Sequence, residues 1–149
     1  LMDVWRVSAT GLASIERGYI EDTSWWKGTS PGAAFSPNQM AMGIAEVVRH
    51  ATLMAREFGF ATQVHFRCEW RGLKGRTLHD FHHRWMFQGH EATDDVRKSR
   101  ATATIGALEA NWTEVAALLA GPVMRAFGVG HVVTPAWFST QSTEWRRNR

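Results

Sequence analysis

Residues 36–59 constrain the fold most strongly, because they combine a helix start, a long helical period and a helix stop. The Ser36 hydroxyl can accept a hydrogen bond from an unpaired amide of the first turn, and Pro37 loses no bond there. Apolar residues then recur every three or four positions up to Phe58, which makes one continuous stripe along a long helix. Gly59 stands where a left-handed C-terminal residue is favoured. The stripe requires a second layer to cover it.

Segments of alternating polarity predict that this second layer is a sheet. From Val64 to Trp70, apolar and charged residues alternate, as in a strand with one buried face. The opening residues 3–20 read as a hairpin with a turn near Gly11. Further strands are expected at 76–87, after a turn at Gly72–Gly75, at 100–108, and at His131–Val133, where Pro135 favours an edge.

A second helix is expected after Asn111, which can cap it together with Glu114 three residues later. Its apolar residues continue at helical spacing up to Ala126, and Pro122 predicts a kink or a short break. Residues 21–35 show no sustained period and are expected to form a loop. The expected fold is α+β, in the order β-β-α-β-β-β-α-β. It has two layers, a mainly antiparallel sheet with two amphipathic helices packed on one face.

The length of 149 residues fits one domain, expected at 1–143, followed by a basic C-terminal tail at 144–149. The lone cysteine, Cys68, cannot form an internal disulfide, which favours a reducing, cytoplasmic location. No apolar run approaches the ~18 residues of a membrane span, so no membrane partner is expected.

The charge balance points to two small regions rather than to a basic protein. Seventeen Lys and Arg against fourteen Asp and Glu give +3, and the tail, with three arginines and one glutamate, carries +2 of it. A basic hairpin and the tail are candidates for contact with nucleic-acid phosphate. A solvated outer face of an antiparallel sheet is the favoured interpretation of the hairpin. The candidate residues are Arg67, Arg71, Lys74, Arg76, Arg146, Arg147 and Arg149.

Histidines concentrate in the segment LHDFHHRW, where His79, Asp80 and His83 have side chains that ligate divalent metals. On a strand His79 and His83 would share a face, whereas a catalytic zinc needs three converging ligands. Imidazoles exposed to water on a polar strand or loop are the favoured alternative. HExxH, GxSxG and P-loop motifs do not occur, and no catalytic residue or cofactor is expected.

Trp25 and Trp26 are adjacent in the expected loop, so an extended backbone would leave one indole exposed. An exposed indole there would mark a ligand or partner surface. The alternative is a loop that folds back on the sheet.

Three strings carry a family resemblance: VWRVSATGLASIERGYI, VHFRCEWRGLKGR and the closing FGV. Their order resembles the C-terminal portion that follows an AlbA-type (Schlafen-like) DNA-binding domain in bacterial ATP-binding proteins and transcriptional regulators. The AlbA-type domain itself is not in this sequence. The resemblance implies that nucleic-acid or nucleotide binding belongs mainly to a preceding domain.

The resulting expectation is a non-enzymatic accessory module of a larger, DNA-binding regulatory protein. It would supply an interaction, ligand-sensing or oligomerisation surface, with a protein partner or a second copy bound there. Two alternatives stay open: a metal-dependent hydrolase or nuclease that uses the histidine segment, and a direct nucleic-acid binder that uses the basic hairpin and tail.

Overall fold

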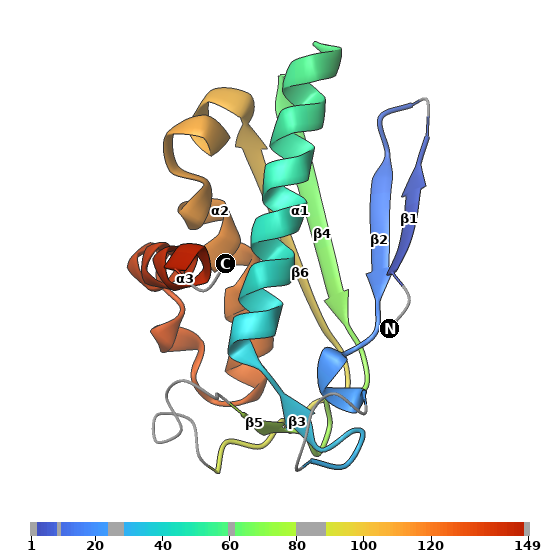
Figure 1. Cartoon of the computed structure of the whole chain (residues 1–149), viewed down its shortest axis with the longest axis vertical. Helices are drawn as coiled ribbons and strands as arrows, with labels where there is room; N and C mark the ends of the chain where they lie inside the picture. The colour runs from blue at the N-terminus through green and yellow to red at the C-terminus, as the bar shows by residue number, and fades with distance from the viewer. Residues whose placement is uncertain (1–2, 9, 24–28, 60–61, 80–88, 148–149) are drawn as a thin grey trace.

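A computed structural model describes residues 3–8, 10–23, 29–59, 62–79 and 89–147, with only the backbone described for 3, 5, 7 and 142–147. In these residues, three helices and three pairs of strands make an α+β fold, which confirms the expected class (Figure 1). The elements are β1 (Asp3–Val7), β2 (Ala13–Arg17), the 3-10 turn η1 (Ile20–Asp22), β3 (Ala34–Phe35), α1 (Pro37–Phe58), β4 (Gln63–Trp70), β5 (Thr77–Leu78), β6 (Arg97–Thr104), α2 (Ile105–Ala126), the 3-10 turn η2 (Gly130–Val132) and α3 (Pro135–Arg147).

The strands pair two by two. β1 with β2 and β4 with β6 are antiparallel, as expected, whereas the two-residue strands β3 and β5 run parallel. Strand β5 is therefore shorter than the expected 76–87, and residues 80–88 lie outside the described part of the chain. The β4–β6 pair, called the ribbon below, is the longest, with eight residues in each strand.

Helix α1 begins and ends where its capping residues predict. The Ser36 hydroxyl accepts from the Gln39 amide at 3.3 Å, and Pro37 occupies the first turn. Gly59 adopts φ of 63° and its amide donates to the Ala55 carbonyl, so the left-handed C-terminal residue is confirmed. Between these caps α1 buries Ile44 and Val48 against α2.

Strand β6 passes directly into α2, where the Thr104 hydroxyl accepts from the Ala107 amide at 3.2 Å. The strand expected at 100–108 is therefore shifted toward the N-terminus. The non-helical residue in α2 is Asn111, with φ of −156° and ψ of 70°, so the helix is interrupted there and the short break expected at Pro122 does not occur. Thr113 and Glu114 bind the Asn111 side chain, which restarts the helix there. The carbonyl left without a donor by Pro122 belongs to Leu118, which is exposed to water.

The final strand expected at His131–Val133 is also wrong. These residues belong to η2 and its end, and α3 follows, with the Thr134 hydroxyl accepting from the Trp137 amide at 3.1 Å. Pro135 starts this helix rather than marking a strand edge. The backbone of α3 continues to Arg147, so most of the expected tail is helical.

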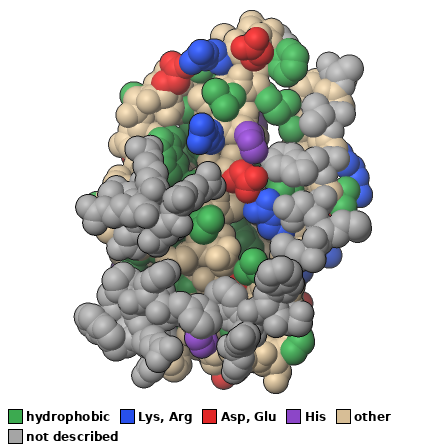
Figure 2. All heavy atoms as spheres, viewed as in Figure 1, with side chains coloured by type: hydrophobic (Ala, Val, Ile, Leu, Met, Phe, Trp, Pro, Cys, Tyr) green, Lys and Arg blue, Asp and Glu red, His purple; other side chains and the backbone are tan. Residues whose placement is uncertain are grey.

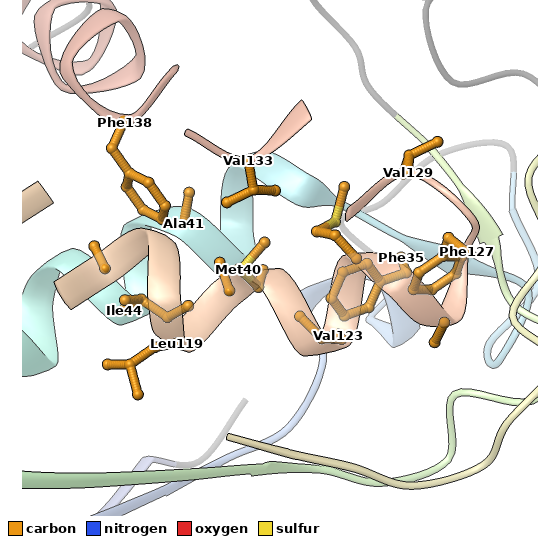
Figure 3. Close-up of a cluster of buried hydrophobic side chains, with 14 of the residues drawn as sticks. Phe35, Met40, Ala41, Ile44, Leu119, Val123, Phe127, Val129, Val133 and Phe138 are labelled. Carbon is orange, nitrogen blue, oxygen red and sulfur yellow. The ribbon is translucent and has the colours of Figure 1, made fainter. Parts of the chain in front are cut away.

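The core lies between α1, α2 and the inner face of the ribbon. Figure 3 shows Ile44 of α1 and Leu119 of α2 in this cluster, which Phe138 of α3 joins at one end. At the other end Phe35 stacks on Phe127, with ring centroids 5.0 Å apart. The ribbon contributes Phe66 and Ala101 from its inner face, so its opposite face is left to solvent.

Candidate functional site: the outward face of the ribbon

Strand alternation divides the ribbon into an inner apolar face and an outward polar face. The inner face carries Phe66 opposite Ala101 and Cys68 opposite Ser99. The outward positions are exposed to solvent, with Glu69 partly so. These eight positions define the outward ribbon face: Gln63 opposite Thr104, His65 opposite Thr102, Arg67 opposite Arg100, and Glu69 opposite Lys98.

One end of this face is neutral and rich in hydrogen-bonding groups. The His65 imidazole Nδ1 lies 2.9 Å from the Thr102 hydroxyl, which fixes the ring across the ribbon. Gln63 and Thr104 complete this end with an amide and a hydroxyl, each of which can both donate and accept.

The other end carries a carboxylate between two cations. Glu69 lies 2.6 Å from the Arg71 guanidinium and 3.5 Å from the Lys98 ammonium. Desolvation raises the pKa of Glu69, but the two cations outweigh it, and the pKa lies below its usual value. Glu69 is therefore ionised at neutral pH and neutralises one of its two basic neighbours.

The middle of the face holds two arginines that face each other. Arg67 and Arg100 are directly opposite across the strands, where Cβ atoms lie about 4.5–5.5 Å apart. Both are exposed, and within the described residues neither forms an ion pair with an acid. Like charges in this position destabilise a sheet. With Arg71 the outward ribbon face holds four cations and one carboxylate, a net charge of +3.

The structure separates the basic residues expected to act together. Arg67 and Arg71 lie on or beside the outward ribbon face, and Lys74 is exposed in the turn that follows β4. Arg76 is 4% exposed and does not reach the surface, so its assignment to a basic face is wrong. The side chains of Arg146 and Arg147, and all of Arg149, lie outside the described residues.

Arg76 instead joins η1 to the start of β3 and to the turn after β4. Its guanidinium donates to both carboxylate oxygens of Asp22, at 2.8 and 2.6 Å. It also donates to the carbonyls of Ala34 and Gly72, at 2.7 Å each. Its guanidinium carbon lies 4.1 Å from the centre of the Tyr19 ring. Arg76 is thus a structural cation whose positive charge is matched by a carboxylate.

A second carboxylate is buried beside this ion pair. Glu21 is 3% exposed, and its Oε1 accepts from the Ser36 amide at 2.5 Å. Burial raises the pKa of Glu21 despite that hydrogen bond and the charge of Arg76. Burial likewise raises the pKa of Tyr19 to about 12, and the Tyr19 hydroxyl donates to the Arg71 carbonyl at 2.8 Å.

Two other expected sites fall largely outside the described residues. Trp25 and Trp26 are not described, and neither are Asp80 and His83 of the expected metal site. His79 is half-buried at the end of β5, and its amide donates to the Phe35 carbonyl at 2.9 Å. Within the ranges that are described, no three His, Cys, Asp or Glu side chains gather as metal ligands would.

Cys68 lies on the inner face of the ribbon, whereas His65 lies on the outward face, as alternation predicts. Burial raises the pKa of the Cys68 thiol to about 11, because a buried environment disfavours the charged thiolate. The thiol is therefore protonated at neutral pH and poorly suited to nucleophilic attack.

Sequence reasoning did not select Arg100 and Lys98 as site residues. The signal was present in the alternation of RKSRATAT, which places Lys98, Arg100, Thr102 and Thr104 on one face. The pairing partner of that strand decides which residues face Arg67, and the local sequence does not specify it.

Comparisons with protein families, with curated proteins and with solved structures found no match to this chain. In the described residues, no helix combines the length and apolarity needed to cross a membrane.

Proposed function

We propose that this chain is an accessory binding module of a larger regulatory protein, and that its outward ribbon face binds nucleic acid. The observation that supports the proposal most strongly is the pairing of Arg67 with Arg100. The two guanidinium groups repel each other on an exposed surface, and within the described residues no acid compensates them. An anion placed over the pair would turn this repulsion into attraction.

Arginine at both positions favours phosphate as the group bound there. The planar guanidinium donates two parallel hydrogen bonds that match the oxygens of a phosphate. The positive charge extends along the ribbon from this pair to Lys98 and Arg71. A row of cations on an open sheet face fits a chain of phosphates better than a single small anion.

The proposal joins two of the sequence-based hypotheses. The family resemblance suggests that a preceding domain carries the main DNA-binding activity. A second contact on this module would then add affinity by raising the effective concentration of nucleic acid at the site. For the metal-dependent hydrolase, the described residues add no supporting observation.

The decisive experiment is a fluorescence-anisotropy titration of labelled nucleic acid with the 149-residue chain at several salt concentrations. The test variant is Arg67→Ala/Arg100→Ala. The matched control is Arg49→Ala/Arg56→Ala, which removes two exposed arginines from α1. Figure 2 shows the molecule from the side on which α1 lies, and there positive and negative side chains are interspersed, so this side offers no continuous row of cations.

We expect the ribbon variant to bind more than about tenfold more weakly at low salt, because each charge-assisted hydrogen bond contributes about 1.5–3 kcal/mol. We expect the control to change affinity by less than about threefold at about 0.1 M salt, where exposed charges more than about 10 Å from the site are screened. A urea titration of both variants verifies that they fold. Equal losses in the two variants, or none in the ribbon variant, would refute the proposal.

A further inference from the structure

We infer that the nucleic acid is B-form duplex DNA and that the ribbon enters its major groove with the outward face toward the bases. This inference rests on the proposed function and specifies its ligand. It is supported by the dimensions of the ribbon and by the side chains on its outward face.

The dimensions of the ribbon match the major groove. Strands β4 and β6 pair with each other and, within the described residues, with no third strand. Paired strands lie about 4.8 Å apart. The major groove of B-DNA, about 12 Å wide, admits a two-stranded ribbon, whereas the minor groove, about 6 Å wide, does not. The eight residues of each strand span about 26 Å, which is longer than the groove is wide. The ribbon must therefore run along the groove rather than across it.

The side chains on the outward ribbon face are suited to base edges. Arginine pairs with the O6 and N7 acceptors of guanine, and glutamine pairs with N6 and N7 of adenine, all in the major groove. Arg67 and Arg100 occupy the middle of the face, and Gln63 lies at its neutral end. Threonine at positions 102 and 104 adds hydroxyl groups that donate or accept.

The same face lacks the large aromatic rings that single-strand sites commonly use. None of its eight positions holds Phe, Trp or Tyr, and Phe66 and Trp70 lie on the inner face. The one aromatic ring on the outward face, the His65 imidazole, is held across the ribbon by the Thr102 hydroxyl. Binding of single strands relies on aromatic rings on which bases stack. Double-stranded RNA is disfavoured as well, because its A-form major groove is too deep and narrow for side chains to read.

The charged and neutral ends of the face suggest different roles. Lys98 and Arg71, held by Glu69, form a charged end that contacts the phosphate backbone. Gln63, His65 and their threonine partners form a neutral end that contacts only base edges. Substitutions at the two ends should therefore be distinguishable by their dependence on salt.

The test titrates the 149-residue chain with one mixed sequence presented as duplex DNA, as single-stranded DNA and as duplex RNA. We expect duplex DNA to bind at least about tenfold more tightly than the other two. A duplex with 7-deazaguanine, which lacks the N7 acceptor of the major groove, should bind several-fold more weakly. A duplex with inosine lacks only the amino group of the minor groove and should bind as guanine DNA does.

A neutral variant, Gln63→Ala, leaves the Thr104 cap of α2 in place and should weaken duplex binding without changing its salt slope, because it removes no charge. The ribbon variant Arg67→Ala/Arg100→Ala distinguishes the two levels of the argument. If that variant loses affinity for all three nucleic acids equally, or if 7-deazaguanine has no effect, the inference of major-groove binding is refuted. The proposal that the face binds nucleic-acid phosphate then stands. If the variant loses affinity for none, both proposals fail.

Discussion

Replacing Asp22 by alanine should destabilise the fold, because it leaves the Arg76 guanidinium buried without its carboxylate. Asp22 accepts two hydrogen bonds from Arg76 and one from the Gly32 amide at 2.7 Å. The hydrogen bonds from Arg76 hold the pKa of Asp22 below its usual value, so the pair is ionised at neutral pH. The remaining direct contacts of Arg76, two carbonyls and the Tyr19 ring, carry no full negative charge, and the nearby Glu21 carboxylate acts on the guanidinium only through space, without a hydrogen bond to it.

The expected magnitude follows from the burial of the two partners. Removing one partner of a buried ion pair costs about 3–5 kcal/mol. The Arg76 side chain is 5% exposed and the Asp22 side chain 31%, so water reaches one end of the pair. We therefore expect about 3 kcal/mol, the lower end of the range. For a domain of this size, that loss lowers Tm by about 6–12 °C.

Urea unfolding at pH 7, followed by circular dichroism, measures this loss. The matched control is Glu16→Ala, which breaks the ion pair between Arg6 and Glu16. Their side chains are 70% and 78% exposed, so the control should cost less than about 0.5 kcal/mol. The double variant Asp22→Ala/Arg76→Met should lose less unfolding free energy than the two single variants lose together, because it leaves no unpaired charge buried. A loss below about 1 kcal/mol for Asp22→Ala would refute the reasoning.

Three further predictions concern the core and its buried titratable groups. Leu119→Ala should cost about 3 kcal/mol and Leu118→Ala less than about 0.5 kcal/mol in the same assay, because Leu119 is fully buried and its neighbour is 63% exposed. Glu21→Gln should keep the hydrogen bond from the Ser36 amide. The raised pKa of Glu21 means that the folded wild type loses stability as the pH rises above about 4.5, because the buried carboxyl must then ionise. The stability of the Glu21→Gln variant relative to wild type should therefore rise with pH, and unfolding midpoints at pH 4 and pH 7 check this. Iodoacetamide should alkylate Cys68 at pH 8 at least about tenfold more slowly in the folded chain than in urea, and equal rates would contradict the raised thiol pKa.

The sequence predicts local elements best where capping and periodicity agree. Helix α1 has both, and its start after Ser36 and its end at Gly59 are confirmed. The same signal was present at Thr134 and Pro135, where a hydroxyl caps a helix and proline follows it. Val132 and Val133 suggested a strand there, but an apolar pair is too short to distinguish a strand from a buried turn. Proline at position 135 is consistent with both interpretations, and the cap decides between them.

The charge of a residue is visible in the sequence, but its exposure is not. Arg67 and Arg76 are equally basic, and both follow the expected strand pattern. The structure places Arg67 in solvent and encloses Arg76 between Asp22 and two backbone carbonyls. Asp22 is 54 residues away along the chain, so no local pattern connects the two.

The sequence by itself determines the α+β class, the long helix α1 and the alternation that separates the two faces of β4. These features depend on the spacing of neighbouring residues, which propensity and burial translate directly into helix or strand. Only the tertiary structure decides that Arg100 lies opposite Arg67, and that Arg76 is not part of their surface. Both depend on the register between distant segments, which packing of the whole core selects.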